Sequence, residues 1–396
     1  MLTAFPVVAY DADFTSHPHH TMLAIRPIAF GAPRSLVLTR GPANMMIKGG
    51  ARAIVAPGGF RLTKASTVRR TFHSSSILKH QPFDITKGNS TMATINEPII
   101  HSVFEPQTST WQYIVADPTT KAAVIIDPVL DYDLARNAVS TTTADGLLAT
   151  AEEQGYTVEW LLETHAHADH LTAAAYLQHR LEAMGNKKAG ICIGKRIVGV
   201  QERFAKRYGI EGPEYRAAFD RLLEDDEVLR VGRLEVKVMH LPGHTPDHLG
   251  YLVGSNVFCG DSLFNTDVGT ARCDFPSGDV HQLYASAQKL FSLPDAFRIY
   301  TGHDYVPPDS PRGPQACTTV AEQRSRNKHL RQDTPEDQFV DWRAKRDAGL
   351  GEPRLLHQAL QFNVRGGHLP WKTEGGDRFM KVPLKVAAAG WVDGKV

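Results

Sequence analysis

Short apolar runs, each closed by a polar turn, recur through the middle of the sequence. Residues 111–116 and 122–126 alternate or run apolar as strands do, and Asp127-Pro128 closes the second run. Residues 158–162 form another apolar run, and residues 251–261 have the pattern of a hairpin whose second strand ends in an acid. These runs predict buried strands that end in polar loops.

Helical periodicity appears between these runs. The helix-like stretches are residues 147–154, 171–184, 198–208 and 282–291. In the second stretch, apolar residues repeat on one face from Leu171 to Leu181, so we expect His170 to open that helix. A helix beginning there would hold the polar residues before it on a rigid rim.

The densest polar chemistry of the chain directly follows the run at residues 158–162. Residues 165–170 read His-Ala-His-Ala-Asp-His. Neutral imidazole and carboxylate are ligands for Zn and Fe, whereas Mg and Ca favour oxygen-only shells. A lone His-x-His is usually a solvated polar turn, but this density, with further ligand types downstream, favours a metal site.

Later predicted strand ends each carry one more residue of a ligand type. His244 follows residues 238–241 through a Pro-Gly turn, and Asp261 stands at the tip of the hairpin. His303 follows residues 298–301 after a glycine. Each of these residues alone has an ordinary interpretation as a loop residue. Several strand ends that converge on His or Asp predict a metal centre instead.

The composition narrows the classes of function that remain open. The net charge of +1 argues against a nucleic-acid-binding surface, and 42% hydrophobic residues suffice for a sizeable core. No apolar run approaches the roughly 20 residues of a membrane span. The cysteines show no CxxC spacing, which indicates free thiols in a reducing compartment. They are Cys192, Cys259, Cys273 and Cys317.

The N-terminal part of the chain has a different composition. Residues 14–83 contain ten Lys or Arg and no Asp or Glu, which is typical of a mitochondrial targeting leader. We expect residues 1–93 to be this leader, disordered and cleaved near Phe72 on import into the matrix. An unstructured basic tail of a cytosolic protein is the alternative. Translation from Met22 would shorten the leader, and a start at Met92 would give a cytosolic form.

The order of the ligand types along the chain resembles that of the metallo-β-lactamase superfamily. The resemblance covers residues 97–310 and rests on His165-x-His167-x-Asp169-His170, then Gly-His244-Thr, Gly-Asp261 and Gly-His303. It implies an α/β fold, an αββα sandwich of two mixed β-sheets flanked by helices, with the metal site at the sheet edge. Residues 94–310 would form this catalytic domain.

A stiff proline-rich segment, residues 306–314, should end the sandwich. Thr334 and Pro335 then offer an N-cap and a proline at the first helical position, for a helix to about Ala348. We expect residues 311–396 to be a C-terminal cap that completes the same domain.

Two assignments of the metal ligands remain open, because every residue of both sets is present. In a binuclear site of the glyoxalase II type, two Zn2+ ions would activate water for hydrolysis of a glutathione thioester. His165, His167 and His244 would bind one ion, Asp169, His170 and His303 the other, and Asp261 would bridge them.

In a mononuclear site, one Fe2+ ion would be bound by His165, His244 and Asp261 alone. This facial triad leaves coordination positions for O2 and substrate. The remaining residues of the set would orient the ligands through hydrogen bonds, and they are His167, Asp169, His170 and His303.

Segments beyond the metal ligands closely resemble the persulfide dioxygenase (sulfur dioxygenase) family. They are residues 267–275, 302–305, 318–327 and 363–367. The resemblance implies oxidation of glutathione persulfide with O2 and water to sulfite and glutathione at one Fe2+, in mitochondrial sulfide catabolism. It also implies that Arg272 and Tyr305 bind the substrate. A structural pair of Arg272 with Asp274 or Asp267 is the alternative.

A metal-binding sensor without turnover is the third class of function. Ligands on separate strand ends leave open coordination positions, which favours catalysis over a closed structural site. A homodimer is compatible with the sequence.

Overall fold

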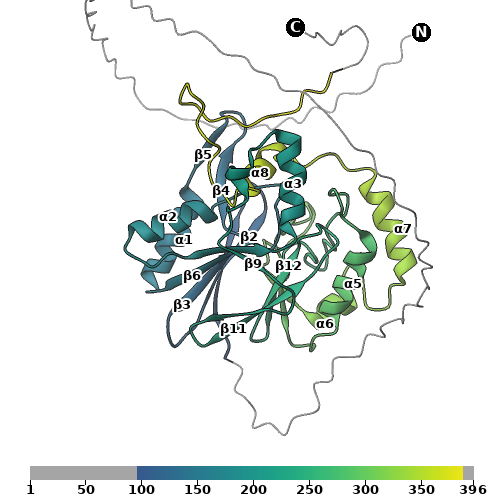
Figure 1. Cartoon of the computed structure of the whole chain (residues 1–396). Helices are drawn as coiled ribbons and strands as arrows, with labels where there is room; N and C mark the ends of the chain where they lie inside the picture. The colour runs from purple at the N-terminus through teal and green to yellow at the C-terminus, as the bar shows by residue number, and fades with distance from the viewer. Residues whose placement is uncertain (1–95, 387–396) are drawn as a thin grey trace, which may run out of the picture. The chain divides into compact units, whose positions relative to one another are not determined.

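Two mixed β-sheets face each other in this chain, as the computed structural model shows for residues 96–386, the range that it describes (Figure 1). The first sheet has the order β1 (Ile99–Glu105), β2 (Thr110–Ala116), β3 (Ala122–Ile126), β6 (Thr157–Leu162), β8 (Gly190–Gly194) and β9 (Arg221–Leu223). The second has the order β10 (Val228–Val231), β11 (Leu234–His240), β12 (Leu249–Val253), β13 (Asn256–Phe258), β14 (Arg298–Tyr300) and β15 (Cys317–Thr319). A small third sheet joins β5 (Ala138–Ser140), β4 (Val129–Asp133) and β7 (Leu171–Thr172).

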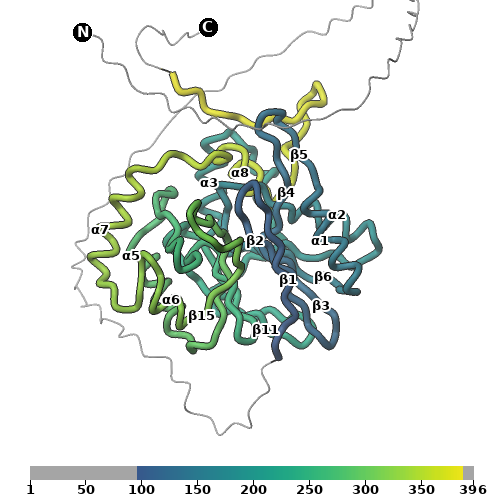
Figure 2. The backbone as a smooth tube through the Cα atoms, turned by 180° about the vertical axis from the view of Figure 1, so that it is seen from behind, coloured from purple at the N-terminus to yellow at the C-terminus, as the bar shows by residue number. Residues whose placement is uncertain are grey.

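Helices pack around the two large sheets. They are α1 (Thr142–Glu153), α2 (Ala174–Ala183), α3 (Ile197–Tyr208), α4 (Gly212–Tyr215), α5 (Val280–Phe291), α6 (Val320–Arg326), α7 (Glu336–Asp347) and α8 (Leu356–Asn363). Helices α1 and α2 lie beside the first sheet, whereas α5 and α6 lie beside the second (Figures 1 and 2). This is the αββα sandwich that the resemblance to the metallo-β-lactamase superfamily implies.

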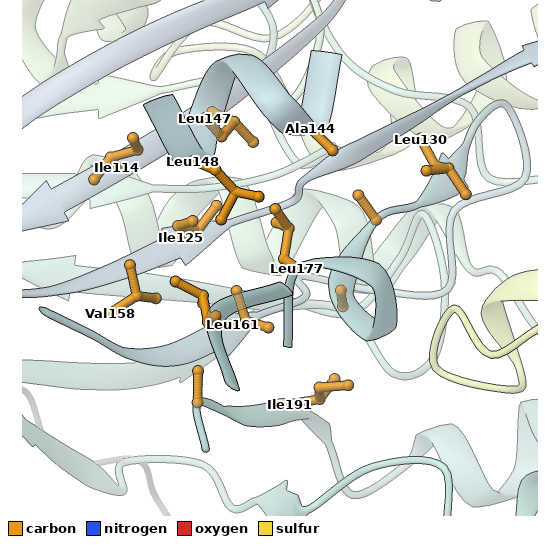
Figure 3. Packing of buried hydrophobic residues seen from close by; sticks show 14 of the residues in the cluster. Ile114, Ile125, Leu130, Ala144, Leu147, Leu148, Val158, Leu161, Leu177 and Ile191 are labelled. Atoms are coloured by element: carbon orange, nitrogen blue, oxygen red, sulfur yellow. The ribbon is translucent and has the colours of Figure 1, made fainter. Parts of the chain in front are cut away.

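The strands β2 and β3 are buried along their whole lengths because both of their faces are covered. On one face, Ile114 packs with Leu147 of α1 and Leu177 of α2 (Figure 3). On the other face, Tyr113 packs with Tyr251 between the two sheets. Successive side chains of a strand point to opposite faces, so burial on both sides explains why these runs are continuously apolar.

Most elements expected from the apolar pattern are confirmed. The runs predicted as strands are β2, β3 and β6, and the predicted hairpin is β12 and β13. The helices predicted at residues 147–154, 198–208 and 282–291 are α1, α3 and α5, each of which begins earlier than the periodicity indicates.

The helix predicted to open at His170 begins only at Ala174. Leu171 and Thr172 form β7 instead, and they pair antiparallel with β4, where Thr172 lies opposite Val129. This pairing keeps the backbone extended. Periodicity within the segment cannot reveal it, because the partner strand lies elsewhere in the sequence.

The second sheet continues past residue 310, where the proline-rich segment is expected to end the sandwich. Strand β15 pairs antiparallel with β14. Helix α7 also differs slightly from its prediction, since Pro335 is the N-cap and Thr334 is not. The Thr334 hydroxyl instead accepts a hydrogen bond from the backbone N–H of Arg331 at 2.9 Å, which engages it in the preceding turn.

The predicted leader, residues 1–93 with Met22, Phe72 and Met92, lies outside the described residues, so its role stays a prediction. Within residues 96–386, no helix has both the length and the apolar character needed to cross a membrane.

Candidate metal centre

The histidine-rich loop, residues 163–170, follows β6 and is fixed by carboxylates from two other segments. The backbone N–H of Thr164 donates to Asp127 at 2.7 Å, and that of Ala166 donates to Asp247 at 2.9 Å. Asp127 directly follows β3 at a φ of 49°, a left-handed conformation that Asp adopts more readily than most residues. Both carboxylates are buried, so the loop is held in place from within the core.

A further support of the loop comes from the C-terminal part of the chain. Asn363 ends α8 and is buried. Its side-chain amide donates to the carbonyl oxygens of His167 and His170, at 2.8 Å each, and its side-chain oxygen accepts from the N–H of Thr172 at 2.9 Å. One side chain therefore satisfies three backbone groups of the segment that carries the histidines.

The residues expected to bind a single ion come together. One ligand atom each from His165, His244 and Asp261 lie within 4.8 Å of one another. They come from the loops after β6, β11 and β13, which end at the same edge of the sandwich. His165 and Asp261 are buried, and the side chain of His244 is 12% exposed.

The two imidazoles are oriented by hydrogen bonds on Nδ1. His244 Nδ1 donates to the carbonyl oxygen of Arg272 at 2.7 Å, so its Nε2 keeps a free lone pair. His165 Nδ1 lies 2.9 Å from the Thr164 hydroxyl, and its Nε2 is buried without a partner. Burial and the neighbouring His167 hold the pKa of His165 well below its usual range, which keeps the ring neutral as a ligand must be.

This donor set fits a metal ion. Two imidazole nitrogens and one carboxylate oxygen suit a first-row metal such as Fe2+ or Zn2+. A buried nitrogen without a partner, as His165 Nε2 is, costs free energy unless a ligand satisfies it.

His303 lies between two carboxylates. Its Nδ1 is 2.6 Å from Asp261, and its Nε2 is 2.6 Å from Asp169. Burial opposes protonation, but Asp261 and Asp169 outweigh it and raise the pKa of His303 well above its usual range. Neither nitrogen is left with a free lone pair, so this geometry makes His303 a residue that orients Asp261.

A second group of ligand atoms lies beside the first. His167, Asp169 and His170 each bring one atom within 4.8 Å of the others. Nδ1 of His167 and Nε2 of His170 are buried without partners, which favours a ligand here as well. A binuclear site of the glyoxalase II type would use Asp169, His170 and His303 for its second ion. The group in the structure has His167 in place of His303.

His167 also contacts two buried carboxyl groups that the sequence analysis did not single out. Its Nε2 lies 3.1 Å from Asp127 and 3.6 Å from Glu163. Burial raises the pKa of Glu163 to about 8. Burial lowers the pKa of His167, but Asp127 outweighs this effect and raises it to about 9. The two carboxyl groups thus fix the orientation of the His167 ring.

His248 is another residue that the sequence analysis missed. Its Nε2 accepts the backbone N–H of Asp261 at 3.0 Å, and its ring stacks on His165 with centroids 4.7 Å apart. Burial lowers the pKa of His248 to about 3, so the neutral ring can accept this bond. The signal in the sequence is a second histidine four positions after His244.

A cavity of about 530 Å³ opens onto His244 and Asp261, which is the size of a small-molecule site. Arg272 and Tyr305, the residues predicted to bind substrate, both line it. A second lobe of about 210 Å³ shares His244 and Arg272 with the first. Its apolar lining includes Phe204, Phe275 and Leu356.

The guanidinium of Arg272 is already engaged. Its Nε and Nη2 donate to the two carboxylate oxygens of Asp274, and Nη2 also donates to the carbonyl of Gly351 at 3.0 Å. This is the structural pair that the sequence analysis keeps as the alternative to substrate binding. The ring of Tyr305 stacks on His303, with centroids 5.4 Å apart and planes 3° from parallel.

Comparisons with known proteins point to one superfamily. The sequence model described as the Metallo-beta-lactamase superfamily matches residues 106–303, which include all the metal-ligand candidates. "Beta-lactamase hydrolase-like protein" of Xylella fastidiosa is 39% identical over 363 residues, which are 90% of this chain and 81% of that protein. "Glyoxylase B2" of Dictyostelium discoideum is 42% identical over 283 residues, or 71% of this chain and 94% of that protein.

Persulfide dioxygenases are more distant relatives. The human "Persulfide dioxygenase ETHE1, mitochondrial" is 29% identical over 272 residues, which are 68% of this chain and 89% of that protein. The crystal structure of ETHE1 from Myxococcus xanthus aligns with a TM-score of 0.54 at 29% identity, covering 68% of this chain and all of that one. The predicted sandwich fold is thereby confirmed.

Proposed function

The chain belongs to the metallo-beta-lactamase superfamily, and from this premise we propose that it is an enzyme whose single metal ion is held by His165, His244 and Asp261. The observation that carries this proposal is the position of His303. In a binuclear site of the glyoxalase II type His303 would be a ligand of the second ion, but its nitrogens are engaged by Asp261 and Asp169. His303 then acts by keeping Asp261 in place.

We propose oxidation of glutathione persulfide as the reaction. The terminal sulfur is oxidised by O2, and with water the products are sulfite and glutathione, so no external reductant is needed. When bound, Fe2+ supplies open coordination positions and redox chemistry. The 29% identity to persulfide dioxygenases supports this reaction.

The protein's own groups prepare the site for this chemistry. Thr164 and the carbonyl of Arg272 orient the imidazoles of His165 and His244, so each ligand nitrogen is held in place. The cavity of about 530 Å³ would hold the substrate beside these ligands.

Hydrolysis of a glutathione thioester is the second candidate. The relatives at 39% and 42% identity carry hydrolase and glyoxylase names, and those names favour hydrolysis over oxidation. The group of His167, Asp169 and His170, with its two orphaned nitrogens, also supports a second ion. In that case the protein would hold two Zn2+ ions.

One experiment separates the candidates. Protein purified without oxygen is analysed for metal, then assayed for sulfite formed from glutathione persulfide and for cleavage of S-lactoylglutathione. One iron per chain with sulfite formation supports the oxidation. Two zinc ions per chain with thioester cleavage would instead support the hydrolase. Bound metal with neither activity would identify a sensor.

A further inference from the structure

The cavity at the metal centre has a basic lining contributed by the C-terminal segment. Three of its residues, which we call the arginine wall, lie on α7 or after it: Arg343, Arg346 and Arg354. The acidic residues of the same lining are Asp169 and Asp261, and both contact His303. The arginine wall therefore carries positive charge on residues that take no part in the metal centre.

The end of α7 is firmly attached to the loop that follows Asp261. Arg343 is buried and pairs with Asp347, and its Nη1 also donates to the carbonyl of Thr270 at 3.3 Å. Asp347 in turn accepts the backbone N–H of Cys273 at 2.8 Å. Arg346 follows Arg343 by three positions, on the same side of the helix. The backbone of Arg346 is thus held in place at the cavity.

Arg346 and Arg354 differ from the other arginines that line this cavity. Arg272 is paired with Asp274, and Arg343 with Asp347. Within residues 96–386, the side chain of neither Arg346 nor Arg354 has an ion-pair or hydrogen-bond partner, and both residues are exposed. A guanidinium without a partner offers parallel N–H donors that match a carboxylate, and it is more weakly hydrated than an ammonium group.

We propose that Arg346 and Arg354 bind the carboxylates of the substrate. This inference rests on the proposed function, because a glutathione-linked substrate carries two carboxylates and a reacting group at its cysteine sulfur. The reacting group must reach the ligands of the metal centre, so the carboxylates contact the rest of the lining. Both candidate reactions use a glutathione-linked substrate, and the assignment is the same for either.

Binding of S-methylglutathione measures carboxylate recognition without turnover, since its sulfur is blocked. In calorimetry on the metal-loaded protein, Arg346→Ala and Arg354→Ala should each raise its Kd roughly five- to tenfold, and the double variant should raise it further. The diethyl ester of S-methylglutathione lacks both carboxylate charges. Wild-type protein should bind it weakly, and the arginine substitutions should leave its Kd unchanged.

Lys345→Ala is the matched control. It removes one positive charge from the same helix, its side chain is 80% exposed, and it does not line the cavity. Its Kd for S-methylglutathione should stay within about twofold of wild type. If Lys345→Ala raises the Kd as much as the arginine substitutions do, the effect comes from net charge alone and the proposal is wrong. So would an unchanged Kd in both arginine variants, or no binding to wild type.

Turnover assays keep this proposal separate from the proposed function. If persulfide is oxidised with the same KM in wild type and both arginine variants, the anion site is wrong and the function stands. If neither candidate reaction occurs but binding of S-methylglutathione depends on Arg346 and Arg354, the function is wrong and the anion site stands. Metal content and thermal unfolding of each variant confirm that it is folded.

Discussion

Asn363 donates its side-chain amide to the backbone carbonyl of His167 at 2.8 Å, across 196 positions of the sequence. The same amide donates to the carbonyl of His170 at 2.8 Å. These groups are buried, so no water replaces the bonds if the amide is lost. The end of α8 therefore determines the shape of the loop that carries the metal-binding histidines.

Asn363→Ala should weaken metal binding. It leaves buried backbone groups unsatisfied, so we expect a Kd for the metal at least about tenfold higher and a loss of about 1–3 kcal/mol in the free energy of unfolding. Metal titration and urea unfolding measure the two effects.

Gln201→Ala is the control for Asn363. Gln201 is also buried and also donates two hydrogen bonds, to the carbonyls of Tyr215 and Val364, but these bonds reach no residue of the histidine-rich loop. We expect a similar loss of stability with unchanged metal affinity. If both variants bind the metal with the same affinity, Asn363 does not support the metal centre.

The ligands themselves give the sharpest test of the ion count. His165→Ala, His244→Ala and Asp261→Ala should each lose most bound metal and activity, because a three-residue set has no spare ligand. His303→Ala should keep the ion and turn over more slowly, since it only orients Asp261. Elemental analysis measures the metal. Full occupancy in a ligand variant, or an ion missing from His303→Ala, contradicts the single-ion assignment.

Arg272→Ala distinguishes substrate binding from a structural pair. Because Asp274 already occupies its guanidinium, we expect lower thermal stability with the KM for glutathione persulfide changed by less than about threefold. Asp274→Ala leaves the Arg272 guanidinium without this partner and should lower the thermal stability by a similar amount. A tenfold or greater rise in KM for Arg272→Ala, with unchanged stability, would instead support substrate contact.

Asp117 links the two sheets in a pH-dependent way. It accepts hydrogen bonds from the N–H of Arg233, at 2.7 Å, and from the Thr120 hydroxyl, at 2.7 Å. Burial opposes its charge, but these bonds outweigh burial and hold the pKa of Asp117 below its usual range. Its stabilisation is thus complete above the unfolded pKa of about 4 and is lost as the pH falls through the folded pKa.

Asp117→Asn should therefore destabilise the protein by roughly 1–3 kcal/mol at pH 7 and by progressively less toward pH 3. Urea unfolding across this range measures the difference from wild type. Asp341→Asn, whose side chain is 79% exposed, should have little effect at any pH. A destabilisation by Asp117→Asn that does not vary with pH would show that its charge is not involved.

The leader is tested by localisation. Residues 14–83 carry ten basic and no acidic residues, so residues 1–93 fused to a fluorescent protein should drive import into the mitochondrial matrix. A matched fusion with the arginines of residues 1–93 replaced by glutamine should stay in the cytosol. A diffuse signal from the native leader would favour the basic tail of a cytosolic protein.

The strands of the sandwich could be predicted because they are buried on two faces. A run such as residues 122–126 is apolar at every position, and no distant partner is needed to recognise it. The histidine cluster was equally visible, since its residues are adjacent in sequence. The error at Leu171 arose because its extended backbone depends on pairing with β4, far from it in sequence.

The supports of the metal centre could not be predicted in the same way. Asp127, His248 and Asn363 are single polar residues, and each acts through a backbone group or a ring brought to it by the fold. A lone polar residue after a strand or at a helix end usually contacts solvent. Only the tertiary structure identifies the few polar residues that are buried next to a metal-binding side chain.

Because His167 depends on Asn363 for its backbone geometry, the order of synthesis matters. As the chain leaves the ribosome, the histidine-rich loop appears first, and the amide that shapes it follows almost two hundred residues later. We expect nascent chains that lack α8 to bind metal weakly, so that metal is acquired at the end of translation or after it. Contacts this distant in sequence also slow folding, which leaves the histidines open to other metals for longer.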